Sequence, residues 1–324
     1  MRDLRISVTD RCSFRCVYCM PRELYDDHEY LARSEILTYD EIIRFADVVS
    51  KFGVAKIRLT GGEPLLRKQI STLVEGLAAI DGIEDLAMTT NGQLLAKQAE
   101  SLAAAGLNRV TVSLDAVDDE VNRKLIDTDL PVSAILEAID AADAAGLGPV
   151  KINAVVRRGW NENQIVPLVD HFRGTGHTVR FIEYMDVGTT NAWKSDEVVS
   201  SGQILETLSQ RWELEPIDPA YRGEVATRYR FTDGAGEIGF ISSVSEPFCG
   251  DCTRLRLAAD GTVYTCLFAS SGTDIKTPMR AGATDEELAQ IIAELWTVRD
   301  DRYSELRGST PIDFPRVEMS YIGG

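Results

Sequence analysis

Short runs of aliphatic and β-branched residues alternate with amphipathic segments along the first part of the chain. The runs predict strands at 4–8, 55–60, 85–90, 109–114, 150–156 and 178–184. Between them, apolar positions recur at helical spacing over 39–52, 94–105 and 134–145, and a glycine follows each of these segments. Six strands with intervening helices predict an α/β fold, a parallel sheet of βαβ units curved into a partial (β/α)6 TIM-like barrel.

The pattern changes after about residue 190. One helix is predicted at 200–212 and another at 284–296, and short strands separated by glycines are predicted at 226–231, 237–241, 254–258 and 262–266. We therefore expect two domains, a partial barrel over 1–190 and a C-terminal antiparallel β-containing extension over 191–324.

Composition narrows the class of protein. The chain has 324 residues, 34 basic against 51 acidic, and a net charge of −17, which argues against a general grip on nucleic-acid phosphates but allows a local basic pocket. No run of 18 apolar residues appears, and the first residues lack the apolar core of a signal peptide. We expect a cytoplasmic protein with no membrane segment, in which clustered cysteines serve metal binding or catalysis rather than disulfides.

Three of the six cysteines lie in one loop after the first predicted strand, in "TDRCSFRCVYCMP" at 9–21. Their spacing is C-x3-C-x2-C: Cys12, Cys16 and Cys19. In a parallel αβ barrel, ligands bind at the carboxyl ends of the strands, where this loop lies. Three thiolates leave a structural zinc one ligand short unless another residue, such as His28, completes it. They suit an iron–sulfur cluster whose fourth iron binds an exchangeable ligand.

Polar groups recur at the same predicted ends of the other strands. "TGGEP" at 60–64 offers backbone for close approach to a ligand and the carboxylate of Glu63. Further candidates are Thr89, Ser113, Asp115, Lys151 and Asn153, together with "EYMDVG" at 183–188. Each alone fits a structural cap or a solvated charge; their recurrence at one edge favours a binding site.

The other three cysteines have the spacing C-x2-C-x13-C in "FCGDCTRLRLAADGTVYTC": Cys249, Cys252 and Cys266. A zinc ribbon is one reading of this motif, but no cysteine is left to complete either set, so we favour a second three-cysteine cluster. Arg254 and Arg256 alternate with leucines and would point to one side of a strand, where guanidinium groups suit a polyphosphate. Arg5 and Arg58 lie on the first two strands and could converge on the same cavity.

The first cysteine loop, with Tyr18 just before its last cysteine, resembles the signature of radical S-adenosylmethionine enzymes. Taken with "IRLTGGEPLLR", "TTNG", "VSLDA", "EYMDVG", "SSVSEPFCGDCTRLRL" and a terminal Gly-Gly, the chain is similar nearly end to end to the GTP 3′,8-cyclases, the molybdenum cofactor biosynthesis protein A family. Similar enzymes usually carry a further N-terminal segment, and here four residues precede Arg5.

The resemblance implies a lyase that converts GTP to 3′,8-cyclo-7,8-dihydro-GTP, the first step of molybdenum cofactor biosynthesis. It implies two [4Fe-4S] clusters and S-adenosylmethionine as cofactors, with a radical derived from the latter attacking the ribose of GTP. As partners it implies a one-electron reductant, a second copy of the chain in a homodimer, and a downstream cyclic pyranopterin monophosphate synthase. Rival readings are a radical peptide-maturing enzyme and a non-enzymatic zinc-stabilised binding module.

The residue roles follow from the same resemblance. Metal ligands are the two cysteine triads, one for each cluster, with the open iron of the second meeting the guanine: Cys12, Cys16, Cys19, Cys249, Cys252 and Cys266. The implied cofactor contacts are Tyr18, Gly62, Glu63, Ser113 and Met185, and the implied GTP contacts are Arg5, Arg58, Thr89, Lys151, Arg254 and Arg256. Both Arg254 and Arg256, with the terminal Gly323 and Gly324, are expected in the catalytic centre.

Overall fold

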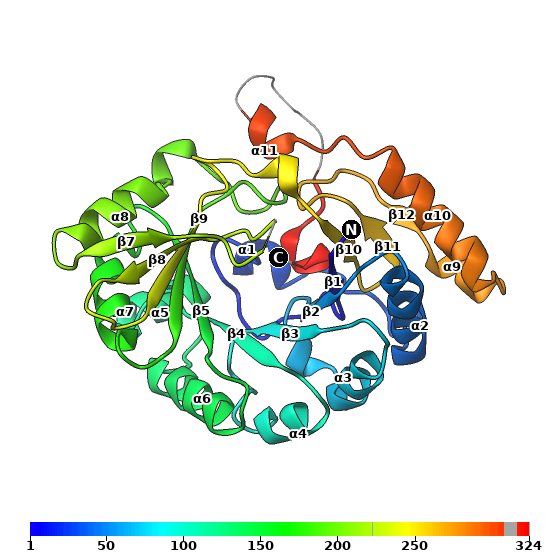
Figure 1. The fold of residues 1–324 in the computed structure, drawn as a ribbon, viewed down its shortest axis with the longest axis horizontal. Helices are drawn as coiled ribbons and strands as arrows, with labels where there is room; N and C mark the ends of the chain where they lie inside the picture. Colours follow the sequence, from blue (N-terminus) through cyan, green and yellow to red (C-terminus); the bar gives the residue numbers. More distant parts are fainter. Residues whose placement is uncertain (222, 308–315, 324) are drawn as a thin grey trace.

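The computed structural model describes residues 1–221, 223–307 and 316–323. These residues contain a twelve-stranded sheet in the order β12-β11-β10-β1-β2-β3-β4-β5-β6-β9-β8-β7. The sheet curves into an open barrel with helices on its outer side (Figure 1). The first six strands along the chain are β1 (Asp3–Ser7), β2 (Lys56–Thr60), β3 (Asp85–Thr90), β4 (Arg109–Ser113), β5 (Lys151–Val156) and β6 (Thr178–Glu183).

These six strands pair in parallel in sequence order, as the hydrophobic pattern predicts. Parallel pairing brings their carboxyl ends to one edge of the barrel, so the loops that follow them share that edge. The partial barrel predicted from the sequence is confirmed.

The C-terminal strands are β7 (Leu214–Ile217), β8 (Thr227–Phe231), β9 (Glu237–Ile241), β10 (Arg254–Leu257), β11 (Thr262–Tyr264) and β12 (Thr273–Asp274). They form two antiparallel groups, β7-β8-β9 and β10-β11-β12. The groups are not a separate appendage: β9 pairs in parallel with β6, and β10 pairs in parallel with β1. Both open edges of the barrel are thus extended, and β10 carries its arginines beside the first strand.

The outer layer is made by α2 (Tyr39–Ser50), α3 (Ile70–Ala78), α4 (Ala99–Ala104), α5 (Asp119–Ile126), α6 (Val132–Ala144), α7 (Ile165–Phe172) and α8 (Ser201–Ser209). Shorter or later helices are α1 (Arg22–Tyr25), α9 (Lys276–Arg280), α10 (Asp285–Thr297), α11 (Tyr303–Leu306) and α12 (Met319–Ile322). Capping boxes begin α2, α8 and α10, where a Ser or Thr side chain and a Glu or Gln three residues later bond each other's backbone amides. The sequence pattern identified α2, α4, α6, α8 and α10 but not α3, α5 or α7.

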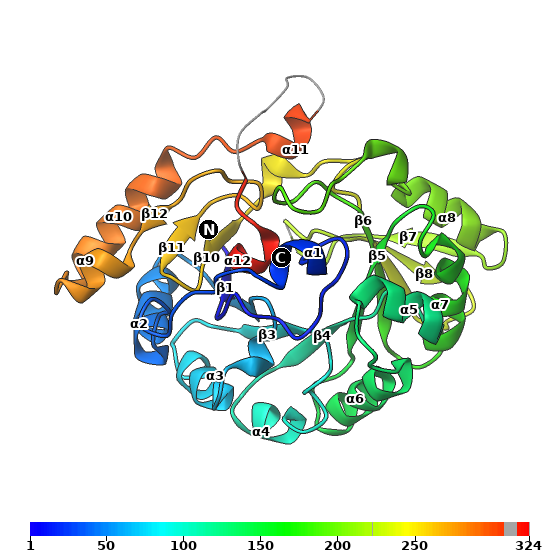
Figure 2. The same cartoon turned by 180° about the vertical axis from the view of Figure 1, so that it is seen from behind.

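The main hydrophobic core lies between the sheet and its outer helices. A small second cluster contains Ala258, Tyr264 and Ile322 and packs the C-terminal helix α12 against the β10 side of the sheet. Seen from behind, α12 lies near the centre of the ring beside α1 and β1 (Figure 2). No helix among the described residues is both long and apolar enough to span a bilayer.

Candidate active site

One cavity of about 350 Å³ occupies the centre of the barrel, and all six cysteines line it. None of the six forms a disulfide, and each is half-buried. The two triads, more than two hundred positions apart in sequence, therefore face one space. The two predicted cluster sites therefore lie in one cavity.

The first triad lies in the loop after β1, where buried acids and a tyrosine surround it. Burial, then the nearby Glu63, raises the pKa of Cys12 to about 11, and burial likewise raises the pKa values of Cys16 and Cys19. The Cys12 sulfur accepts a hydrogen bond from the Phe14 amide at 3.4 Å. Thiols in this half hold their protons until a metal displaces them.

Two buried carboxylates shape the loops of this half. Glu63 accepts hydrogen bonds from the Leu65 amide (3.0 Å), the Thr90 hydroxyl (2.8 Å) and the Asn91 amide (2.7 Å), so it ties the Gly-Gly turn to the end of β3. It does not line the cavity, whereas the adjacent Gly62 does. Burial raises the pKa of Glu63 to about 7. Direct contact of Glu63 with a cofactor therefore stays a prediction.

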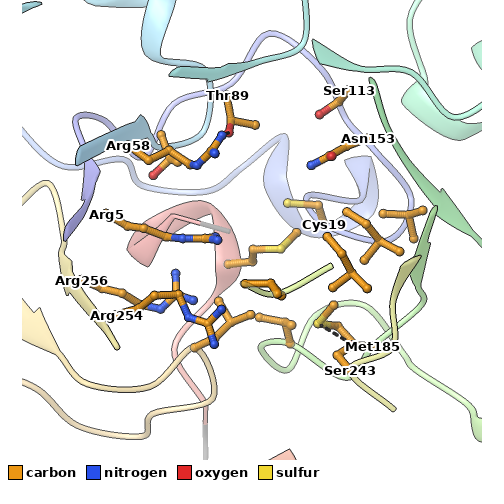
Figure 3. Close-up of a pocket in the computed structure, with 18 of the residues that line it drawn as sticks. Arg5, Cys19, Arg58, Thr89, Ser113, Asn153, Met185, Ser243, Arg254 and Arg256 are labelled. Carbon is orange, nitrogen blue, oxygen red and sulfur yellow. Dashed lines mark hydrogen bonds between the residues drawn. The ribbon is translucent and has the colours of Figure 1, made fainter. Parts of the chain in front are cut away.

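Asp115, at the end of β4, orients the aromatic residue of the cysteine motif. Its carboxylate accepts a hydrogen bond from the Tyr18 hydroxyl at 2.6 Å and another from the Val155 amide at 2.8 Å. Tyr18, Ser113 and Met185 all line the cavity near this triad. The Met185 sulfur lies 3.5 Å from the Ser243 hydroxyl, which contacts it from the C-terminal extension (Figure 3).

Positive charge gathers in the other half of the cavity. The guanidinium groups of Arg5, Arg254 and Arg256 point into it from β1 and β10 (Figure 3). Further lining cations are Lys56, Arg58, Lys151, Arg180 and Arg299. Burial, then the neighbouring Arg254, lowers the pKa of Arg5 to about 10, and burial and then Arg180 lower the pKa of Lys151 to about 7. The positive charges in this half of the cavity repel one another, so a polyanion would bind favourably there.

The alternation on β10 places its side chains as the sequence indicates. Arg254 and Arg256 line the cavity, while Leu255 and Leu257 lie in the core. Arg58 donates hydrogen bonds to the hydroxyls of Thr89 and Thr111, both at 3.0 Å, which fixes its guanidinium across the sheet. Arg5, Arg58, Thr89 and Lys151 share the cavity with the β10 arginines.

The second triad has basic neighbours instead of acidic ones. Burial alone would raise the pKa of Cys252, but the charge and hydrogen bonds of Arg254 outweigh it and lower that pKa. Arg254 donates to the Cys252 sulfur from Nη2 at 3.1 Å and from Nε at 3.3 Å. The Cys266 sulfur accepts from the Phe268 amide at 3.4 Å. Burial raises the pKa of Cys266, so the shift towards a thiolate belongs to Cys252.

The donor set fits iron–sulfur clusters. Each triad offers soft, unpaired sulfur ligands, and both Cys12 and Cys266 also accept backbone amide hydrogen bonds of the kind that tune cluster sulfurs. Among the described residues, no group of three or more His, Cys, Asp or Glu side chains is placed to hold a single metal ion.

The C-terminal segment reaches the same site. The Arg256 guanidinium donates to the Gly323 carbonyl at 2.6 Å, although Gly323 itself does not line the cavity. Met319 and Ser320 of α12 do line it. The predicted position of Gly324 lies outside the described residues.

Comparisons with known proteins agree over the whole chain. The family profile of the radical SAM superfamily matches residues 6–172, and that of Molybdenum Cofactor Synthesis C matches residues 177–305. A GTP 3′,8-cyclase of Xanthomonas campestris is 51% identical over 324 residues, which are 100% of this chain and 95% of that protein. One from Acidothermus cellulolyticus is 49% identical over 350 residues, covering 100% and 97% of the two chains.

The chain belongs to the GTP 3′,8-cyclase family. It is a radical SAM protein, and the fold agrees with solved structures of that superfamily. Streptococcus suis SuiB bound to S-adenosylmethionine matches with a TM-score of 0.64 at 16% identity, over 94% of this chain and 67% of that one. Methylornithine synthase matches with a TM-score of 0.51 at 16% identity, over 64% and 61%.

Three cations and one tyrosine that line the cavity were not predicted from the sequence: Lys56, Arg180, Arg299 and Tyr221. For Lys56 and Arg180 a signal was present. Lys56 lies two positions before Arg58 on β2, and Arg180 lies at an alternate position of β6, so both share the inward face of their strands. Tyr221 comes from a loop between β7 and β8 and carries no such signal; its hydroxyl contacts the Lys56 amine at 2.8 Å.

Proposed function

We propose that this chain is a GTP 3′,8-cyclase, which converts GTP to 3′,8-cyclo-7,8-dihydro-GTP in the first step of molybdenum cofactor biosynthesis. The observation that carries the proposal is the shared cavity: both cysteine triads and eight cationic side chains line it. A radical peptide-maturing enzyme would not need so many buried cations around one space, and the named relatives over the full chain are cyclases.

Cys12, Cys16 and Cys19 would hold the cluster of the first triad. A [4Fe-4S] cluster bound there would supply one electron for the reductive cleavage of S-adenosylmethionine. Gly62 would present backbone to the methionyl group, and Tyr18, Ser113 and Met185 would contact the rest of the cofactor. Asp115 keeps Tyr18 in place through its 2.6 Å hydrogen bond.

The basic half of the cavity would bind the triphosphate. Arginine guanidiniums pair with phosphate oxygens through two parallel hydrogen bonds, and Arg5, Arg254 and Arg256 gather on one side of the cavity. Burial, and then repulsion from neighbouring arginines, lowers the pKa values of Arg5, Lys151 and Arg180 in the free protein, and a bound polyanion would relieve that repulsion. Substrate binding should therefore stabilise the fold and take up protons.

Cys249, Cys252 and Cys266 would hold the second cluster, with an open iron near the guanine. With the triphosphate held by the arginines and the base held at this triad, the ribose between them is fixed relative to the first triad. Positioning of this kind is the contribution a protein makes to radical chemistry, along with exclusion of water.

Other parts of the proposal rest on the family resemblance. We infer a one-electron reductant that feeds the clusters, a downstream cyclic pyranopterin monophosphate synthase that uses the product, and a homodimer. We also infer location in the cytoplasm, where glutathione keeps cysteines reduced. The division at residue 190 into barrel and extension is likewise a proposal.

The test is anaerobic reconstitution of the full chain with iron and sulfide, followed by S-adenosylmethionine, a reductant and GTP. The proposal predicts brown protein that produces 5′-deoxyadenosine and the cyclised nucleotide when GTP is present. ATP in place of GTP is the matched control and should give no cyclised product. Colourless protein with bound zinc, or cleavage that needs a peptide, would overturn the proposal.

A further inference from the structure

The last described residues form a segment, here called the tail (316–323), whose end meets a substrate-side arginine. Besides accepting from Arg256 at 2.6 Å, Gly323 has positive φ (75°) and lies so close to the sheet that an added Cβ would come within 2.0 Å of the Thr60 hydroxyl oxygen. The tail therefore ends at one fixed place against β1 and β2. Gly323 permits this close approach because it has no side chain, so other residues must hold the tail in position.

The tail's own secondary structure cannot set that position. Helix α12 has four residues, a single turn, which is unstable by itself in water. Its apolar anchors are Ile322, which is buried with Ala258 and Tyr264, and Val317 and Tyr321, which pack against the same cluster. Together with the hydrogen bond from the Val317 amide to the Ala269 carbonyl at 3.0 Å, they hold one side of the tail to the sheet.

A second anchor comes from the loop after β6, here called the β6 loop (185–190). The Glu318 carboxylate accepts three hydrogen bonds from it, each 2.8 Å long: from the Thr189 amide, the Thr189 hydroxyl and the Thr190 hydroxyl. Gly188 permits this approach, because a Cβ there would lie 2.1 Å from a Glu318 carboxylate oxygen.

A second set of contacts joins the same loop and tail, with the roles of donor and acceptor exchanged. Here the loop supplies the carboxylate, and Arg316 of the tail donates to Asp186 at 2.7 Å. Arg307 adds an ion pair to Asp186 at 2.8 Å, and Tyr303 also donates to it. Asp186 is 6% exposed, so these contacts are shielded from competing water.

The β6 loop also faces the cavity through Met185, while the tail faces it through Met319 and Ser320. We infer that Glu318 is a positioning residue: held by Thr189 and Thr190, it sets where Gly323 meets Arg256. Through it, the loop that would contact S-adenosylmethionine is tied to the arginine that would contact GTP. The catalytic consequence rests on the proposed function; the anchoring itself does not.

The first test measures the anchor without reference to activity. In the reconstituted full-length protein, Glu318→Ala should speed hydrogen exchange of the Tyr321, Ile322 and Gly323 amides by about tenfold or more, since these amides bond within the tail. Peptides from β2 to β5 should exchange as in the wild type. Glu287→Ala is a matched control, because Glu287 also accepts a threonine amide at 2.8 Å, on the distant helix α10. Its effect should stay on α10.

The second test asks whether Glu318 acts through the tail end. Glu318→Ala should lower kcat/KM for the cyclised product by about tenfold, as loss of positioning does. In a chain that ends at Ile322, the same substitution should have no further effect, whereas a general structural role would give additive losses. Glu318→Gln keeps one acceptor oxygen and should fall between; it also serves as the test variant if Glu318→Ala does not fold.

Unchanged tail exchange in Glu318→Ala or Glu318→Gln would overturn the inference, and so would additive losses in the shortened chain. If the wild type makes no cyclised product, the proposed function fails. Exchange of the tail amides still decides the anchor in that case.

Discussion

The two cysteine triads contain the same number of thiols and line the same cavity, yet their surroundings have opposite charge. Around Cys12, Cys16 and Cys19 lie the buried acids Glu63 and Asp115, and thiol pKa values are raised. Around Cys252 lie arginines, and its pKa is lowered. The sulfur ligands are alike, so the neighbours must determine what each site takes.

The difference matches the two ligands that the family implies. S-adenosylmethionine presents a zwitterionic amino acid and a sulfonium, which do not require a cationic pocket. GTP carries several negative charges, and eight cationic side chains line the cavity, with Arg254 bonded to Cys252 of the second triad. We propose that charge directs cofactor and substrate to different ends of the cavity. The predictions below test this assignment, beginning with the largest expected effect.

Cys16→Ala should abolish formation of 5′-deoxyadenosine and remove about half of the iron, because one of the three ligands of the first cluster is lost. Cys252→Ala should also remove about half of the iron, but should retain slow cleavage of S-adenosylmethionine. Iron analysis and product chromatography check both. Equal loss of S-adenosylmethionine cleavage in the two variants would contradict the assignment of that cofactor to the first triad.

Arg254→Ala combined with Arg256→Ala should weaken GTP binding by about 100-fold or more, since each lost charge-assisted contact costs about 1.5–3 kcal/mol. The affinity for S-adenosylmethionine should change by less than about threefold. Equilibrium binding to the anaerobic protein measures both affinities. Arg230→Ala, which removes an exposed ion pair with Glu215, is the control; GTP affinity as in wild type for the double variant would remove the triphosphate role.

Lys151→Met should weaken GTP binding yet stabilise the free protein, by about 1–2 kcal/mol at pH 8. The pKa of Lys151 is lowered from 10.5 to about 7, so the unfolded chain binds more protons in this range. Wild-type stability should therefore fall as pH drops from 10.5 to 7, and the variant should lose less. Denaturant unfolding at several pH values tests this; a destabilised variant would contradict it.

Asp115→Asn should have the smallest effect. An amide can still accept from the Val155 amide while its NH2 group donates to the Tyr18 hydroxyl, so Tyr18 stays in place. We expect KM for S-adenosylmethionine to rise about threefold, against about tenfold or more for Asp115→Ala, which loses both contacts. Steady-state kinetics with saturating GTP distinguishes the two; equal values would show that Asp115 does not act through Tyr18.

Local patterns predicted much of this molecule, and the reasons are visible at particular residues. Strand β3 occupies the residues expected for it, because its apolar run is bounded by clear turn signals. The alternation on β10 correctly sends Arg254 and Arg256 inward. Helices α3, α5 and α7 were not predicted, although Gly174 lies two residues after the end of α7 just as Gly106 lies two residues after the end of α4, so a following glycine alone did not decide which helices were identified.

Long-range features lay beyond sequence reasoning. The parallel pairing of β10 with β1 joins Arg5 to Arg256 across more than 240 positions, and no local pattern encodes it. The reciprocal contacts of Glu318 and Asp186 depend on the same kind of distant approach. The sequence indicated which polar and charged side chains each strand carries. Tertiary packing determined which of them lie in the same half of the cavity.

Electron paramagnetic resonance of the reduced, fully reconstituted protein tests the division of the cavity most directly. Each ligand is added alone, with Cys16→Ala and Cys252→Ala proteins used to assign the two cluster signals. The account predicts that S-adenosylmethionine changes only the signal of the Cys12, Cys16 and Cys19 cluster, and that GTP changes only the signal of the Cys249, Cys252 and Cys266 cluster. If both ligands change the same signal, or GTP changes neither, the account is wrong.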